Sequence, residues 1–204
     1  MFSDECSVER GAGKRRGWIW RQSGQRFDKD KVHPSNKSKD LRCMVFGVIC
    51  DQECSDLIVM RRDMTSAVQS YTAESYIEAL RFSLPLIWNP WRIFQQDGAR
   101  IHTAKKTIKF LQQYNICWIE DWPPYSPDLN PIEHVWSLLK QRLYELFPDI
   151  ENWQGPDESV IERMENALVY VWDTLDPQFI RNCVESMPKR YEAVVASGGQ
   201  YMRY

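Results

Sequence analysis

The run Cys43–Cys50 constrains the fold of this chain most, because its eight residues read CMVFGVIC and are apolar almost throughout. Such a run is typical of a strand buried on both faces near the centre of a sheet. The chain has 204 residues, of which 43% are hydrophobic. That is enough for one sizeable core, and we expect a single domain.

Strand and helix patterns alternate on either side of this central strand. Thr72 begins a capping-type sequence, and apolar residues follow it at helical spacing. The other expected strands are Phe2–Cys6, Gly17–Gln22, Asp56–Met60, Ile93–Gln96 and Ile116–Ile119. The expected helices are Thr72–Leu86, Thr103–Tyr114, Pro131–Phe147, Glu158–Asp173, Pro177–Glu185 and Lys189–Ala196. This order predicts an α/β fold.

Hydropathy and cysteine spacing also indicate the location of the protein in the cell and whether it has a membrane partner. No stretch reaches the roughly 18–20 consecutive apolar residues that a membrane span requires, so we expect no membrane partner. The six cysteines are scattered and form no CxxC pair. This favours reduced thiols of an intracellular protein over disulfides or a zinc site.

The first candidate site residue is Asp97. The segment Trp91–Phe94 is apolar and favours a strand, and it stops abruptly at Gln95-Gln96-Asp97-Gly98. A buried strand that ends in this way presents a carboxylate at its exposed tip.

The second candidate is Glu133, in the run SPDLNPIEHVW at positions 126–136. This run predicts a proline-braced turn followed by a helix that opens at Pro131, a favoured first-turn position. Glu133 then lies in the first helical turn, where a negative charge is favourable. A carboxylate at a strand end and another at a helix start can converge on a divalent metal. The alternative is a capped helix beside an unrelated loop acid.

A third acid, Asp4, follows a short apolar start at the beginning of the chain. Asp4 in FSDE, Asp97 in QQDGARIH and Glu133 in SPDLNPIE resemble the three metal-binding acids of mariner-superfamily (DDE) transposases. The 35 residues between the last two are close to the spacing of the commonest branch. The segments at 18–27, 43–51 and 186–204 fit the same family, so the resemblance covers essentially the whole chain.

The resemblance implies an RNase H-like mixed sheet flanked by helices. It places a catalytic domain over residues 1–148 and a helical extension, packed on the same domain, over residues 149–204. It implies DNA strand cleavage followed by attack of the freed 3′-hydroxyl on target DNA. DNA is therefore the expected partner, the nucleus is the expected location, and a homodimer is a further expectation.

The same resemblance implies two Mg²⁺ or Mn²⁺ ions and no small-molecule cofactor. Asp4 would bridge both ions, while Asp97 and Glu133 would complete one site each. Hard divalent cations prefer carboxylate ligands. Two such ions roughly 3.5–4 Å apart can act on the attacking and the leaving oxygen of a phosphodiester.

The chain also departs from the family. A complete transposase begins with helix-turn-helix recognition modules, and the sequence shows none, while only three residues precede Asp4. We therefore expect a truncated, poorly anchored first strand and a fragment, a misassembled gene product or a decayed copy. One alternative is an inactive remnant that binds nucleic acid or protein. Another is a hydrolase that uses Asp97 and Glu133 as a metal-free acid/base pair.

Charge is unevenly distributed although the net charge is only −2. Residues 1–42 hold eleven Lys or Arg against six Asp or Glu, whereas residues 143–180 hold one against nine. Two basic clusters are candidate phosphate contacts, with a solvated surface as the alternative. They are Lys14, Arg15 and Arg16, and Lys105, Lys106 and Lys109.

Two further residues, His102 and Glu5, lie near the acids in the sequence. His102, five positions after Asp97, matches a histidine often found there in the family, and it is a candidate for contacting phosphate or orienting an acid. A structural role at a helix start is the alternative. Glu5 adjoins Asp4 and is expected on the opposite face of the strand.

Overall fold

The computed structural model describes residues 1–11, 41–124 and 126–199. The expected strand Gly17–Gln22 and the basic cluster Lys14, Arg15 and Arg16 lie outside the described residues. No helix of the described residues is long and apolar enough to cross a membrane.

The secondary structure follows the α/β order expected from the sequence. The strands are β1 (Phe2–Glu9), β2 (Arg42–Cys50), β3 (Glu53–Cys54) and β4 (Ile58–Val59). The α-helices are α1 (Ala73–Ser83), α2 (Lys105–Gln113), α3 (Ile132–Leu146), α4 (Asp157–Asp173), α5 (Pro177–Glu185) and α6 (Met187–Ala196). Short 3-10 helices lie at η2 (Leu84–Leu86), η3 (Pro127–Leu129) and η4 (Ile150–Asn152).

The sheet is mixed, with β2 near its middle as expected. β2 pairs antiparallel with β1 on one side and with β3 and β4 on the other. Beyond β1 the chain continues the sheet in parallel, through bridges from Phe2 to Gln95 and from Phe94 to Trp118. β1 is therefore an inner strand, and its eight residues all pair with β2. Asp4 lies on a strand that has neighbours on both sides.

The two segments expected as strands near Phe94 and Trp118 form only isolated bridges. Side chains replace part of the regular ladder beside β1. The hydroxyl of Ser3 donates to the backbone carbonyl of Gln95 at 2.7 Å, and the backbone N–H of Ser3 donates to the Gln95 side-chain carbonyl at 3.2 Å. The segment is thus anchored without extended backbone pairing.

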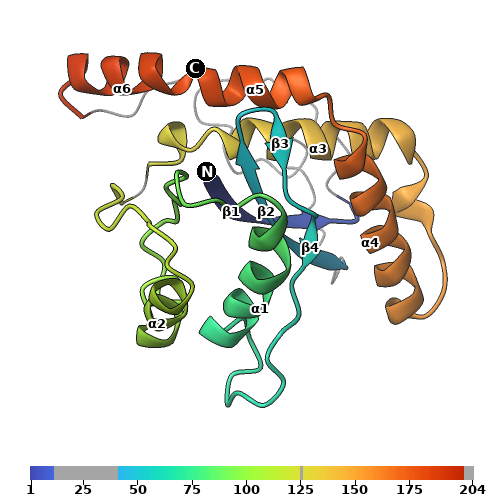
Figure 1. Cartoon of the computed structure of the whole chain (residues 1–204). Coiled ribbons are helices and arrows are strands. Elements are labelled where there is room, and N and C mark those ends of the chain that lie inside the picture. The colour runs from blue at the N-terminus through green and yellow to red at the C-terminus, as the bar shows by residue number, and fades with distance from the viewer. Residues whose placement is uncertain (12–40, 125, 200–204) are drawn as a thin grey trace, which may run out of the picture.

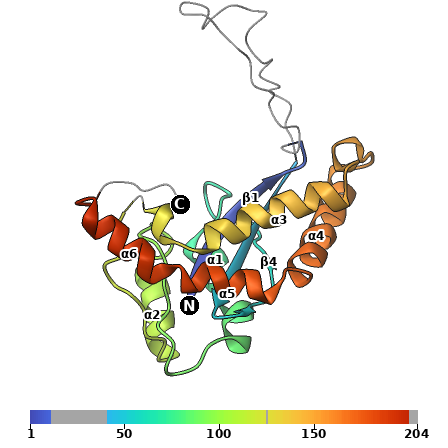
Figure 2. The same ribbon diagram turned by 90° about the horizontal axis from the view of Figure 1, so that it is seen from above.

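Helices cover both faces of the sheet (Figures 1 and 2). On one face, α3, α4 and α5 bury apolar side chains against Val45 and Ile49 of β2. On the other, α1 and α2 pack over Phe46 and Val48. Successive β2 residues therefore enter opposite cores, which explains why this strand is apolar almost throughout.

Gly47 allows two helices to approach the sheet closely. A Cβ atom at this position would lie 2.9 Å from the indole rings of both Trp136 and Trp172. These rings, from α3 and α4, stack with centroids 5.2 Å apart. Gly47 is also the cross-strand partner of Asp4. The position of α3 relative to Asp4 on β1 therefore depends on a residue without a side chain at position 47.

Replacing Gly47 by alanine should lower the free energy of unfolding by about 1–3 kcal/mol, because overpacking forces the two indole rings to shift. Urea denaturation would measure the change. Gly98→Ala is the matched control, since a Cβ there would meet no atom within 4 Å. Equal stability of Gly47→Ala and the wild type would show that the packing of α3 and α4 does not require glycine.

Candidate metal centre

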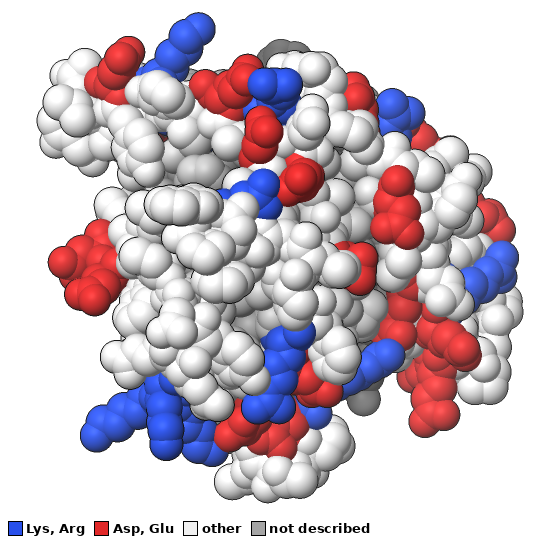
Figure 3. All heavy atoms as spheres, in the orientation of Figure 1, with Lys and Arg blue, Asp and Glu red and all other residues white. Residues whose placement is uncertain are grey.

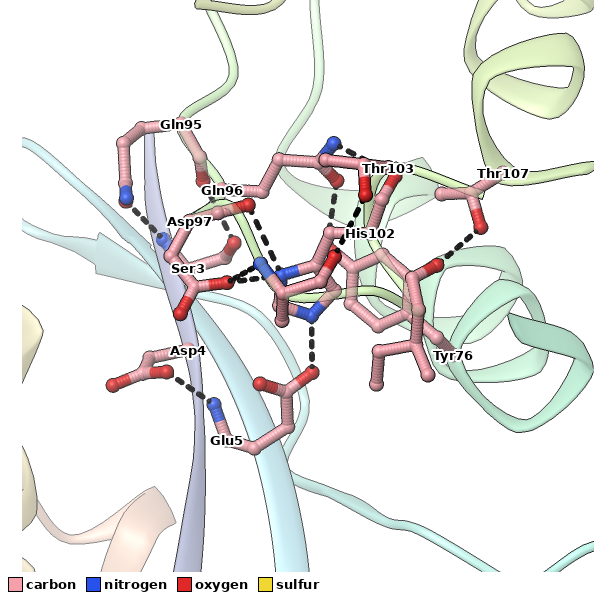
Figure 4. Close-up of polar contacts among 12 residues, drawn as sticks. Ser3, Asp4, Glu5, Tyr76, Gln95, Gln96, Asp97, His102, Thr103 and Thr107 are labelled. Atoms are coloured by element: carbon pink, nitrogen blue, oxygen red, sulfur yellow. Dashed lines mark hydrogen bonds and ion pairs between the residues drawn. The ribbon is translucent and has the colours of Figure 1, made fainter. Parts of the chain in front are cut away.

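Sheet register brings Asp4 and Asp97 together. The parallel bridge joins Phe2 to Gln95, and each acid follows two residues further along its own segment. Neighbouring parallel segments run in step, so the two carboxylates reach the same place. Figure 4 shows the Asp4 side chain on β1 and the Asp97 side chain on the neighbouring segment, and both border one cavity. This confirms the expectation that Asp97 stands where its strand segment ends.

Glu133 reaches the same place from α3. The preceding turn is attached to β1 through Asn130, whose buried side-chain amide donates to the Ser3 carbonyl at 3.0 Å. On the other side of this turn, the guanidinium of Arg190 in α6 donates to the Asp128 carbonyl at 2.9 Å. Glu133 follows in the first turn of α3, as the proline-braced motif predicts.

One cavity of about 420 Å³ is bordered by all three acids. Its wall also includes two residues that the sequence did not single out, Arg100 and Trp122. Arg100 lies only three positions after Asp97, and Trp122 immediately precedes two prolines, but neither spacing identifies a role without the fold. Besides the three acids, the cavity therefore has a guanidinium that can pair with a phosphate group and an indole ring on which a base can stack.

Without a cation, the three carboxylates repel one another. Burial, followed by repulsion from Glu5, Glu133 and Asp97, raises the pKa of Asp4 to about 8. The hydrogen bond that Asp4 accepts from the Glu5 backbone N–H, at 2.9 Å, only partly offsets this rise. Asp4 is therefore mainly protonated at neutral pH in the empty cavity, and positive charge there would favour its carboxylate form.

His102 lies between two acids from different parts of the chain (Figure 4). Its Nδ1 is 2.5 Å from Asp97 Oδ1, and its Nε2 is 2.8 Å from Glu5 Oε1. Burial lowers the pKa of His102, but the two hydrogen-bonded carboxylates outweigh burial and raise it to about 10. The imidazolium donates from both nitrogens. In turn, the hydrogen bond from His102 is the main cause that lowers the pKa of Asp97.

This position corrects the expectation that His102 contacts phosphate. The side chain is only 3% exposed, and both ring nitrogens have partners inside the protein. Of the roles considered from the sequence, orienting an acid fits the structure. Glu5 does point to the face of β1 opposite Asp4, as expected, and it is there that it meets His102.

The lysines of α2 remain candidates for DNA contact. Lys105, Lys106 and Lys109 are all exposed on this helix, which begins three residues after His102. Basic side chains gather at the lower left of the view in Figure 3, where α2 lies, while acidic side chains are spread over the side of α4. Lys106 is partly neutralised by Glu74 at 2.6 Å.

Comparison with known proteins decides the family. Residues 1–154 match the family described as DDE superfamily endonuclease, and this match spans all three acids. The chain belongs to the DDE superfamily endonucleases.

Two relatives show which branch of the DDE endonucleases is similar. The chain is 26% identical over 212 residues to the Tc1 transposase of Caenorhabditis elegans and 27% identical over 209 residues to the Tcb1 transposase of Caenorhabditis briggsae. Both alignments cover all of this chain and 70% of the relative. The sequence similarity of this DDE endonuclease thus lies with transposases of the Tc1 type, in line with the resemblance that the sequence motifs indicated.

Solved structures confirm the RNase H-like fold. The Mos1 transposase paired-end complex with left transposon end has a TM-score of 0.66 at 20% identity, covering 98% of this chain and 55% of that chain. The Mos1 transposase catalytic domain with Raltegravir and Mg has a TM-score of 0.55 at 21% identity, covering 79% and 78%. The chain therefore spans about half the length of the Mos1 chain in the paired-end complex.

The donor set of this DDE endonuclease fits hard divalent cations. All three acids that border the cavity offer carboxylate oxygens, which Mg²⁺ and Mn²⁺ prefer. Asp4 interacts electrostatically with both Asp97 and Glu133. Among the described residues, however, no three His, Cys, Asp or Glu side chains are placed to hold a single ion.

The raised pKa of Asp4 gives the metal-free protein a characteristic pH dependence. Between about pH 4 and pH 8 the unfolded chain has lost this proton while the folded chain keeps it, so Asp4 makes the wild type progressively less stable as pH rises. Asp4→Asn should remove the effect. At pH 8 it should be more stable than the wild type by at least about 1 kcal/mol, since one pKa unit corresponds to about 1.4 kcal/mol.

Urea unfolding in EDTA at pH 4, 6 and 8 would measure this difference, which should shrink towards pH 4. Asp56→Asn is the matched control, because Asp56 is exposed and does not border the cavity. If Asp4→Asn is no more stable than the wild type at pH 8, the acids do not repel one another as described.

Proposed function

We propose that this chain cuts DNA strands and joins the freed 3′ ends to target DNA by divalent-metal-dependent phosphoryl transfer. The observation that carries the proposal is the meeting of Asp4, Asp97 and Glu133 at one cavity in a DDE endonuclease. Their presence together favours an active catalytic region over an inactive remnant. It also favours metal chemistry over an acid/base pair, because a third acid, Asp4, borders the same cavity as Asp97 and Glu133.

Two Mg²⁺ or Mn²⁺ ions fit this proposal, with Asp4 shared and Asp97 and Glu133 each completing one site. The Mos1 transposase catalytic domain has been solved with Raltegravir and Mg and with Raltegravir and Mn, which supports the choice of ions. When bound, such ions activate the attacking oxygen and stabilise the charge on the leaving oxygen.

The protein groups around the ions would hold the DNA. Arg100 is exposed and borders the cavity, where it can pair with a backbone phosphate. Trp122 offers an indole face on which an unpaired base can stack. The lysines of α2 extend positive charge away from the cavity. Together they favour backbone contacts over reading of base sequence.

The oligomeric state and the location in the cell are part of the same proposal. Mos1 structures include a paired-end complex and a strand transfer complex. By analogy we propose that this chain acts on DNA as a homodimer, and that it does so in the nucleus, where genomic DNA is available.

Metal-dependent cleavage is the direct test. The chain should nick supercoiled plasmid in Mg²⁺ or Mn²⁺ and not in EDTA. Asp97→Asn should lower the rate at least about 10³-fold, the scale of loss when one member of a catalytic unit is removed. Asp56→Asn is the matched control and should cut like the wild type. An Asp97→Asn variant that cuts as fast as the wild type would show that this acid is not catalytic.

DNA binding by this chain should be weak, insensitive to sequence and steeply reduced by salt, because phosphate contacts release counterions. Each phosphate contact contributes about 0.9 to the slope of log affinity against log salt concentration. The double variant Lys105→Gln, Lys109→Gln should therefore lower the slope by up to about 2. Fluorescence anisotropy with an element end and with scrambled DNA would measure both slopes.

Lys189→Gln, on the exposed surface of α6, serves as the control and should change the slope little. Tight, salt-insensitive binding to one sequence would contradict the expectation that phosphate contacts dominate.

A further inference from the structure

The geometry points to Glu5 and His102 as positioning residues that make Asp97 a ligand through one oxygen only. This inference rests on the proposed metal-dependent function, and it extends it to which ions the site accepts. It starts from the contacts of the two Asp97 oxygens.

Oδ1 of Asp97 is already occupied within the protein. It accepts the backbone N–H of Ala99 at 2.9 Å and the Nδ1–H of His102 at 2.5 Å. No contact of Oδ2 with a described residue accompanies these two. In Figure 4, Oδ2 is the oxygen turned away from His102, on the side where Asp4 lies. Asp97 is thereby fixed with a single oxygen available to the cavity.

Glu5 keeps His102 in the orientation that this arrangement needs. Glu5 Oε1 lies 2.8 Å from Nε2, so the ring nitrogen that faces away from Asp97 also has a carboxylate partner inside the protein. With Nε2 held, the ring cannot rotate away from Asp97. The Glu5 side chain is itself only 17% exposed, so water competes weakly for this bond.

Neighbouring residues also hold His102 through the face of its ring and through its backbone carbonyl. The buried ring of Tyr76 lies against His102 with centroids 4.1 Å apart. The Tyr76 hydroxyl donates to the Gln96 side-chain carbonyl at 3.0 Å, and the Gln96 amide donates to the His102 carbonyl at 3.2 Å. His102 is thus held through its ring nitrogens, its face and its backbone, which is more than a helix start requires.

A carboxylate limited to one oxygen discriminates between cations. Mg²⁺ requires nearly octahedral coordination and favours ligands that each give one oxygen, whereas Ca²⁺ accepts carboxylates through both oxygens. Freed from His102, Asp97 could rotate and offer both oxygens. The Glu5–His102 pair should therefore favour Mg²⁺ and Mn²⁺ over Ca²⁺, in the manner of groups that orient metal ligands.

The test measures Mn²⁺ binding to the whole chain without DNA, through loss of the free-ion electron paramagnetic resonance signal, with Mg²⁺ and Ca²⁺ as competitors. Glu5→Ala and His102→Asn should each weaken Mn²⁺ and Mg²⁺ binding about 10-fold or more. They should also reduce the preference of Mg²⁺ over Ca²⁺. Glu5→Gln keeps an acceptor for Nε2 and should retain most of the binding.

Two measurements separate positioning from a purely structural role. Plasmid nicking by the variants should show a lower kcat and a higher Mg²⁺ requirement, with little change in KM for DNA. Thermal unfolding shows whether each variant folds, and if Glu5→Ala does not, His102→Asn still reports on ion preference. Glu9→Gln is the matched control, since Glu9 lies on the same strand and pairs with Arg42 at 2.7 Å.

If Glu5→Ala or His102→Asn folds and keeps an unchanged Mn²⁺ affinity and an unchanged ion preference, the inference is overturned and the proposed function stands. If Glu5→Ala is unfolded, His102→Asn decides the test: weaker Mn²⁺ binding with a smaller preference for Mg²⁺ over Ca²⁺ supports the inference, and unchanged binding and preference overturn it. A wild-type chain that binds neither Mn²⁺ nor Mg²⁺ would overturn the proposed function and this inference with it.

Discussion

The antiparallel pairing of β1 with β2 is the constraint on which the site depends. Its register sets Asp4 opposite Gly47, and the space left by that glycine lets the indole rings of α3 and α4 lie against the sheet. The same register turns the next residue, Glu5, to the opposite face. A one-residue slip would exchange the two acids and bury each on the wrong side. Both halves of the site therefore depend on one set of strand hydrogen bonds.

Electrostatics divides the site into two parts with opposite behaviour. Around Asp4, burial and like charge favour the protonated acid until a cation arrives. Around Asp97, the His102 imidazolium already compensates the charge and keeps the carboxylate ionised. One acid is thus ready to bind metal, whereas the other gains its charge with the metal. The empty site is compatible with a stable fold because its repulsion is relieved by protonation at Asp4.

Local sequence signals predicted the elements that carry Asp97 and Glu133, and the family resemblance pointed to Asp4, while contacts between distant segments could not be predicted. Asp97 follows an apolar run that stops abruptly, and Glu133 follows a proline-braced turn, so neighbouring residues suffice to place each on its element. The Glu5–His102 contact joins residues 97 positions apart, and the bond from Asn130 to Ser3 spans 127. The segments near Phe94 and Trp118 look like strands but form only bridges. Beside β1, the side chains of Ser3 and Gln95 take over part of the pairing, which no periodicity reveals.

The most direct measurement is an anomalous diffraction map of crystals of this chain soaked in Mn²⁺. The central claim is that Asp4, Asp97 and Glu133 together hold divalent cations. It predicts manganese peaks in the cavity, bonded to Asp4 and Glu133 and to Asp97 through Oδ2, with Oδ1 still on His102. A map with no peak in that cavity, or with manganese held only by other residues, would contradict it.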